Sequence, residues 1–191
     1  MPAHTHSATA RIERAPHAAG ASTRTGSAAP TSALPPVMVR AATQADIDTI
    51  TALRLALLEE HRENPLYARP RAALRARARS LFARQLASPR EITLLAFRNG
   101  TPVGMLRCLE SEGYPLMLPA RYGYLTSAYV CPEARRTGVL RHLVDDAVAW
   151  CRSRGLTQMR LHSVVHAADA NGAWDALGFA IAEHLRVRSI A

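Results

Sequence analysis

The stretch from Tyr122 to Arg154 constrains the fold more than any other part of the sequence. It opens with a β-prone, largely apolar run that ends at Pro132, and a proline stops a strand because it lacks a backbone donor. After a polar turn, the period of apolar residues changes from two to 3.6. One face of the resulting helix carries Leu140, Leu143, Val144, Ala147, Val148 and Cys151. The pattern predicts a strand, a basic turn and a helix in direct succession.

The turn of this unit predicts a binding site for phosphate groups. A helix that begins at Gly138 leaves its first N–H groups without partners, and its dipole adds partial positive charge there. Full charges are added beside those amides by Arg135, Arg136 and Arg141. The turn has neither the Gly-Lys-Ser/Thr ending of a P-loop nor the three glycines of a dinucleotide-binding loop. An ordinary turn with solvated arginines stays open as the alternative.

The composition favours one domain behind a tail. Residues 1–36 hold 5 of the 12 prolines and no aromatic residue, so we expect a disordered tail before a domain at 37–191. No apolar run has the length of a membrane span, and a membrane is not expected as a partner. The three cysteines form no CxxC pair, which favours a reduced, cytoplasmic protein without a metal site.

The remaining segments predict an alternation of strands and helices. We expect a strand near residues 37–42, a helix that starts after Thr43 with Asp46 closing a capping box, and a second helix over 71–87. A hairpin of strands 91–98 and 103–110 is expected around Asn99-Gly100. After the central unit, we expect a strand at 157–165, a short helix at 169–177 closed by Gly178, and a last strand at 179–188.

Three motifs in this order resemble the GNAT N-acetyltransferase family. The turn from Val130 to Arg141 resembles the family's Gln/Arg-x-x-Gly-x-Gly/Ala loop, with Leu140 where the family has Gly or Ala. The hairpin Asn99-Gly100-x-Pro102-Val103-Gly104 is the second motif, and Ala173 to Phe179 is similar to Leu-Tyr-x-x-Leu-Gly-Phe. The resemblance implies an α/β (α+β) fold. Its mixed, mostly antiparallel sheet of six to seven strands, flanked by about four helices, splays apart between the fourth and fifth strands.

The resemblance also implies a co-substrate and a reaction. Acetyl-CoA would donate an acetyl group directly to a primary amine of a small molecule or peptide. The backbone of Ala128, Tyr129 and Val130 would pair with the pantetheine arm. The pyrophosphate would be held by Arg135, Arg136, Thr137, Gly138, Val139, Leu140 and Arg141.

The catalytic residues follow less directly from the resemblance. Trp174 stands at the family's usual tyrosine, and an indole N–H does not release a proton near neutral pH. Ala167 stands where the family has asparagine. His166, which titrates in the right range, and Tyr129 are therefore the catalytic candidates. A surface histidine and a core tyrosine are the alternatives for these residues, and a catalytically silent acyl-CoA-binding module is the alternative for the protein.

The charge of the chain bears on its acceptor. All 24 basic residues are arginine, and the net charge is +9. In the family fold, the second helix borders the acceptor entrance, and here it carries Arg71, Arg75, Arg77, Arg79 and Arg84. Such a stripe would attract an acceptor with an anionic group, unless it points to solvent or pairs with acids of the preceding helix. Aromatic residues are too scattered to stack nucleic-acid bases, so nucleic acid is not expected as a partner. A homodimer stays open.

Overall fold

The middle of the sheet is a hairpin whose turn the sequence dictates. In the computed structural model, which describes residues 34–69, 72–188 and 190, β2 (Glu91–Arg98) and β3 (Thr101–Glu112) are joined by Asn99 and Gly100. Both turn residues have positive φ, 49° and 76°, which suits a tight turn whose twist matches that of its strands. The predicted hairpin is confirmed, and β3 begins two residues before its expected start.

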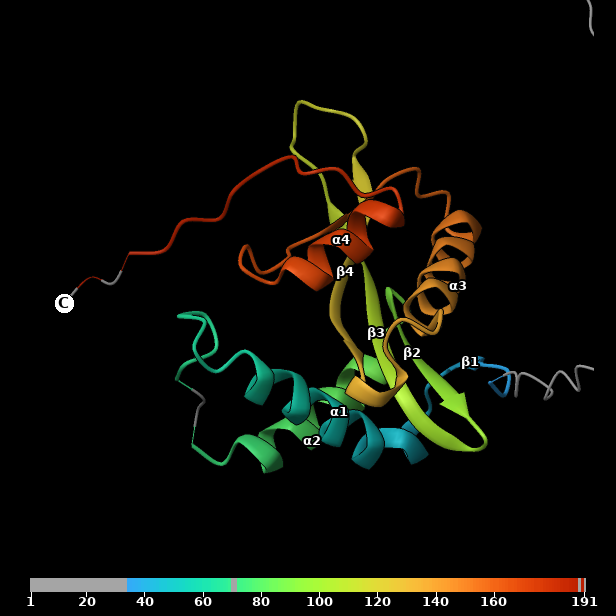
Figure 1. Cartoon of the computed structure of the whole chain (residues 1–191). Helices are drawn as coiled ribbons and strands as arrows, with labels where there is room; N and C mark the ends of the chain where they lie inside the picture. The colour runs from blue at the N-terminus through green and yellow to red at the C-terminus, as the bar shows by residue number, and fades with distance from the viewer. Residues whose placement is uncertain (1–33, 70–71, 189, 191) are drawn as a thin grey trace, which may run out of the picture. The chain divides into compact units, whose positions relative to one another are not determined.

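Five strands form one mixed sheet in the described residues, in the order β1-β2-β3-β4-β5 (Figure 1). β1 (Met38–Ala41) pairs antiparallel with β2, β4 (Arg121–Val130) pairs antiparallel with β3, and β5 (Met159–Leu161) runs parallel to β4. The parallel return requires a crossover, which α3 (Val139–Ser153) supplies. The expected mixed, mostly antiparallel sheet is confirmed.

The sheet parts between β4 and β5. The two strands pair only where Gly123, Tyr124 and Leu125 face Met159, Arg160 and Leu161. Beyond Leu125, β4 continues beside β3 as far as Val130, while β5 has already ended. The second half of β4 therefore has an open side, and the predicted splay between the fourth and fifth strands is confirmed.

The expected strand count was too high. The strand predicted at 157–165 shrinks to the three residues of β5, and residues 179–188, predicted as a last strand, form no strand. From Ile181 on, the larger apolar side chains of that segment, such as Leu185, are exposed and have no neighbouring strand to pack against. Without a paired edge, alternation of apolar and polar residues does not make a strand. The tail predicted at 1–36 lies outside the described residues except for 34–36.

Two apolar clusters cover the two faces of the sheet. On one face, α3 packs Val139, Leu143 and Ala147 against strand residues such as Leu106 and Leu125. Trp174 and Leu177, from α4 (Ala168–Ala176) and the residue that follows it, pack against the same cluster. On the other face, α1 (Ile47–Glu60) and α2 (Leu74–Leu86) enclose Ile50, Leu53, Ala78, Phe82, Leu95 and Met105.

The second helix differs in detail from the expectation. α2 begins at Leu74 rather than at Arg71, which lies outside the described residues. Ala73, with φ of 55°, precedes it in a left-handed conformation that cannot belong to the helix. Leu81 is 41% exposed, because the buried face of α2 is narrow and centred on Ala78 and Phe82.

The start of α1 is tied to β1 by a buried carboxylate. Asp46 accepts the N–H of Thr43 at 2.8 Å, as the predicted capping box requires. It also accepts both Nη atoms of Arg40 at 2.8 Å each. The Arg40 guanidinium, followed by Thr43, holds the pKa of Asp46 well below its usual range. The ionised form of Asp46 therefore stabilises the junction between the first strand and the first helix.

We expect Asp46→Asn to reduce the free energy of unfolding by about 2 kcal/mol at pH 7, since the variant loses a charged hydrogen-bond network. A carboxyl with a depressed pKa in the folded state contributes its stability above the unfolded value of about 4, and loses it as the pH falls through the folded value. Urea unfolding between pH 7 and pH 2.5 measures this. The gap between parent and variant should narrow below pH 4, and a constant gap would contradict the assignment.

Two glycines provide a second test of the packing. A Cβ at Gly123 would overlap the Sγ of Cys151 under α3, whereas a Cβ at Gly172 in α4 would meet nothing within 4 Å. We expect Gly123→Ala to cost about 1–3 kcal/mol of unfolding free energy through overpacking. Gly172→Ala should be neutral or should stabilise by about 0.5–1 kcal/mol, because alanine is the better helix former. Thermal unfolding of both variants tests the pair, and equal melting temperatures would count against the described contact.

Candidate functional site

The basic turn after β4 presents free amides to solvent. A short 3₁₀ turn, Pro132–Ala134, is followed by Arg136 and Gly138 with positive φ, 59° and 85°. Left-handed residues alternating with ordinary ones make an anion-binding concavity of N–H groups. His142 is the first residue of α3 to donate back into the helix, to the carbonyl of Gly138 at 3.2 Å. The four N–H groups from Gly138 to Arg141 are therefore available to a ligand.

Apolar side chains hold this turn against the hydrophobic core. Val139 is 1% exposed, and the half-buried Leu140 packs against the cluster under α3. Leu140 thus contributes to the core, although it stands where the family has a small residue. Gly138 has no atom near the place of a Cβ, so its need for glycine comes from its backbone conformation rather than from crowding.

The arginines of the turn are engaged with neighbouring groups. Arg135 donates its Nε to the carbonyl of Val130 at 3.0 Å and its Nη2 to Glu60 at 2.5 Å. Arg136 pairs with the exposed Asp169 at 3.1 Å, and Arg141 approaches the carbonyl of Ala176 at 3.5 Å. The ion pair of Arg135 with Glu60 links the C-terminal end of α1 to the turn, a contact that sequence reasoning missed.

A fourth arginine supports the turn from the hairpin. Arg98, at the end of β2, donates Nη2 to the hydroxyl of Thr137 at 3.0 Å, and that hydroxyl donates to the carbonyl of Ala134 at 2.6 Å. The Nε of Arg98 is buried and has no hydrogen-bond partner among the described residues. Arg98 is remote in sequence, so only its place at the start of the predicted hairpin turn could have indicated this role.

The open side of β4 offers backbone groups of alternate residues. In an antiparallel pair, both polar groups of one residue point to the same side, and the next residue points to the other. Cys131 donates to the carbonyl of Val103 on β3 at 2.9 Å, so Val130 and Ala128 face away from β3. Tyr129 faces β3 with its backbone and packs its side chain against the cluster under α1 and α2.

Tyr129 and Cys131 are both protonated near neutral pH. Burial, and then the neighbouring Cys131 and Glu60, raise the pKa of the Tyr129 phenol. Burial also raises the pKa of the Cys131 thiol. A phenol in this state can donate a proton but not accept one, and a thiol in this state is a poor nucleophile.

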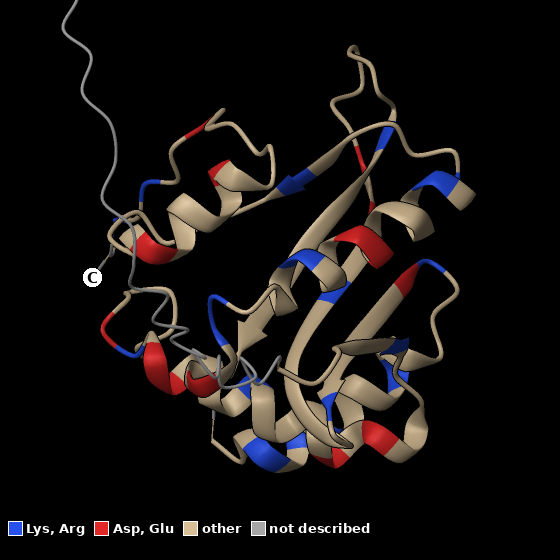
Figure 2. Cartoon of the chain, turned by 45° about the vertical axis from the view of Figure 1, so that its right-hand side comes forward, with Lys and Arg blue, Asp and Glu red and all other residues tan. Residues whose placement is uncertain are grey.

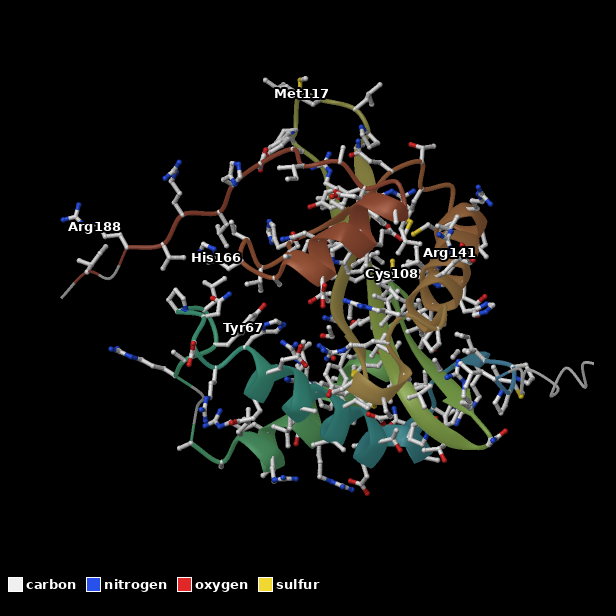
Figure 3. The ribbon with its side chains drawn as sticks, viewed as in Figure 1. Tyr67, Cys108, Met117, Arg141, His166 and Arg188 are labelled. Carbon is white, nitrogen blue, oxygen red and sulfur yellow. The ribbon has the colours of Figure 1, made fainter. Side chains whose placement is uncertain are left out.

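The other candidates lie around α4. His166 is exposed, in the turn between β5 and α4, and Figure 3 shows it on the opposite side of α4 from α3. No hydrogen bond joins it to Tyr129 within the described residues. Trp174 packs edge-on against Phe179 with ring centroids 5.5 Å apart. Asn171, which the sequence analysis passed over, donates to the carbonyls of Val164 and Val165 at 3.1 Å and so fixes the turn that carries His166.

Two further observations concern metals and membranes. Among the described residues, no three His, Cys, Asp or Glu side chains come together in a way that could hold a metal ion. No helix in the described ranges combines the length and the apolar character needed to cross a membrane.

The fold and this site define an α/β protein whose mixed sheet parts between two parallel strands beside an amide-rich turn. Residues 54–179 match the model of the acetyltransferase (GNAT) family, so the chain belongs to that family. No curated protein sequence matches the chain at the level taken as significant.

Solved structures of the same fold cover the domain almost completely. An aminoglycoside N-acetyltransferase in complex with CoA is 17% identical, with a TM-score of 0.68 over 81% of this chain and 95% of its own. A predicted acetyltransferase with acetyl-CoA from Clostridium acetobutylicum is 18% identical, with a TM-score of 0.66 over 80% of this chain and 96% of its own. An aminoglycoside 6′-N-acetyltransferase from Acinetobacter haemolyticus is 20% identical, with a TM-score of 0.65 over 81% and 98%. At these identities the likeness shows the fold.

The turn generates a test of ligand binding. We expect Gly138→Glu to abolish CoA binding in calorimetry, because it strains the left-handed backbone and places a negative charge beside the free amides. Gly155→Glu is the matched control, since Gly155 also has positive φ, 69°, and no atom near its Cβ position, but lies at the other end of α3. Equal CoA affinity of the two variants would show that phosphates bind elsewhere.

Proposed function

We propose that the protein transfers an acetyl group from acetyl-CoA directly to a primary amine of a small molecule or peptide. The observation that carries the proposal is the open half of β4, where Ala128 and Val130 turn backbone groups away from β3, beside the amide-rich turn. An amide-bearing chain that ends in a diphosphate fits such a surface, because a strand edge pairs with amides and a helix N-terminus binds phosphate. Membership of the family supports the same reaction.

The residues of the turn fit a diphosphate in charge as well as in geometry. The backbone from Arg136 to Arg141 would hold it through N–H groups, with Thr137 steadied by Arg98 and Val139 and Leu140 anchored in the core. Arg135 occupies the carbonyl of Val130 through its Nε. We propose that this guanidinium moves toward the phosphates when the ligand binds, which would expose the Val130 carbonyl for pairing.

The reaction requires proton movements at this site. Acetyl-CoA supplies an activated acetyl group, whose bond to sulfur breaks as a bond to the acceptor nitrogen forms. Tyr129 is our candidate for the proton donor to the leaving sulfur, because its pKa is raised and its side chain lies on the α1 and α2 face next to the open half of β4. His166, exposed and without a described hydrogen bond, is our candidate for accepting the proton of the amine through water.

The acceptor is proposed to carry an anionic group. The arginines of α2 support this only in part, because Arg79 pairs with Asp48 of α1 and both signs of charge occur on these two helices in Figure 2. Structural neighbours include aminoglycoside acetyltransferases, whose acceptors are amines of small molecules. We place the protein in the cytoplasm, a location that its three free thiols support.

A catalytically silent acyl-CoA-binding module is the second candidate. It is favoured by Trp174, which packs against Phe179 where many members of the family have a tyrosine. The two candidates differ in turnover. A thiol-release assay with acetyl-CoA and a panel of amines distinguishes them: an enzyme releases CoA in the presence of one of the amines, whereas a silent module binds CoA and releases none.

We expect Tyr129→Phe to lower kcat by about 100-fold with an unchanged affinity for CoA, since only the proton donor is removed. In the parent, kcat should decline with rising pH only above about pH 10, the ordinary pKa of a phenol, because the pKa of Tyr129 is raised. Tyr114→Phe, at an exposed position, is the control. A kcat retained within twofold in Tyr129→Phe would move the donor role to another group, for which His166→Ala is the next variant to measure.

A further inference from the structure

Arg54 is a charged residue on the buried face of a helix. It follows Ile50 by four residues and Leu53 by one, so it shares the face of α1 that packs on the sheet. The side chain is half-buried, and among the described residues no carboxylate lies within salt-bridge distance of it. Charges in such positions are normally paired, because desolvation of a lone charge is costly. Arg54 is therefore a positive charge for which the described residues supply no counter-ion.

The neighbouring charge does not compensate Arg54. Burial lowers the pKa of Arg54, Tyr67 opposes this effect, and the positive charge of Arg107 adds to it. Arg107 is itself paired, through its Nε and Glu91 at 2.5 Å. The carboxylate of Glu91 is thus already engaged with Arg107. A guanidinium cannot respond by losing its proton, so the charge of Arg54 remains.

Hydroxyl and imidazole groups lie on the same face of the sheet as Arg54, and Tyr67 influences the pKa of both Arg54 and Tyr124. Tyr124 of β4 contacts His162, which follows β5 directly, with 2.8 Å between Oη and Nδ1 and 5.6 Å between the ring centroids. Burial raises the pKa of Tyr124, and Tyr67 adds to this effect. The Tyr67 hydroxyl has no hydrogen-bond partner among the described residues. We call Arg54, Tyr67, Tyr124 and His162 the Arg54 cluster.

The Arg54 cluster lies where the sheet parts, on the face opposite α3. Gly123 and Leu125 face α3, so Tyr124 between them faces α1. Leu125 and Leu161 form the last pair of β4 and β5, and His162 comes immediately after it. In Figure 1, the loop after α1, which carries Tyr67 (Figure 3), lies on the same side of β4 as α4 and away from α3. The side chain of Tyr129 lies on the same face of β4, past Leu125, where β4 no longer pairs with β5.

We propose that Arg54, with the hydroxyls of Tyr67 and Tyr124, binds a carboxylate of the acceptor, which makes the acceptor an amino acid or a peptide terminus. A guanidinium and two phenols supply a fork and two further donors, the arrangement that a carboxylate accepts. Polycationic amines such as aminoglycosides are disfavoured here, because Arg54 and Arg107 would repel them. The inference rests on the proposed transfer reaction and names its acceptor more closely.

The kinetic test uses acceptors that differ only in charge. Initial rates are measured for amino acids and for their carboxamides, with kanamycin and spermine as polycations. In the parent, kcat/KM should favour the carboxylate over its carboxamide by at least about tenfold, the effect of one charged hydrogen-bonding group. Arg54→Met should bring this ratio close to one through KM, and Arg54→Lys should restore part of it. The KM for acetyl-CoA should stay the same in all variants.

The matched control is Arg62→Met. Arg62 follows the same helix and pairs with Glu59, but its side chain is 71% exposed and lies outside the Arg54 cluster. The Arg62→Met variant should keep the parent's ratio of kcat/KM between carboxylate and carboxamide. The inference is overturned if Arg54→Met keeps that ratio, if it weakens carboxylate and carboxamide equally, or if kanamycin or spermine is the best acceptor.

A binding measurement keeps the inference testable without turnover. Calorimetry compares N-acetyl amino acids with their carboxamides on protein saturated with CoA, in the parent and in Arg54→Met. Tighter binding of the carboxylate in the parent alone supports the inference even if no amine is acetylated, in which case the proposed reaction fails separately. If no N-acetyl amino acid binds more tightly than its carboxamide, the inference is wrong whatever the activity.

Discussion

The functional architecture depends on the point at which β5 stops pairing with β4. Up to Leu125, the parallel pair holds the sheet closed, and the lack of room for a Cβ at Gly123 beside the Sγ of Cys151 shows how closely α3 lies on it. After Leu161 the chain leaves the sheet, so the backbone of Ala128 and Val130 is free to pair with something else. Unpaired strand edges are normally covered. Here the edge ends at an amide-rich helix N-terminus, and the two features together form one extended surface for a ligand.

A bulge in β4 decides which side chains reach each side of this surface. Ser127 has positive φ, 55°, and the register with β3 shifts between Met105 and Arg107. The extra residue reverses the alternation, since a shift by one residue moves every later side chain to the other face. Ala128 and Val130 consequently pack with the cluster under α3, while Tyr129 joins the face of Tyr124. Without the bulge, Tyr129 would point away from the proposed acceptor side.

The parts of the fold that sequence reasoning predicted are those with local causes. The Asn99-Gly100 turn, the capping box of Asp46 and the amphipathic α3 each follow from a few neighbouring residues. The missed features arise from contacts between distant segments. Residues 179–188 alternate apolar and polar residues as a strand would, but they have no strand edge to pair with. The bulge at Ser127 contains no glycine that could have indicated it in the sequence. The ion pair of Glu60 with Arg135 joins residues 75 positions apart.

The arginines show why the pairing of charges is more informative than their number. The stripe on α2 was the most conspicuous basic feature of the sequence, yet Arg79 pairs with Asp48, and Arg75 and Arg77 are exposed. Exposed guanidinium groups are screened by water and salt, and each contributes little to the selection of a ligand. Arg54 was inconspicuous because it stands alone among apolar residues of α1. A half-buried charge without a counter-ion keeps its field in a region of low dielectric, so a single such residue can select an acceptor more strongly than the whole exposed stripe.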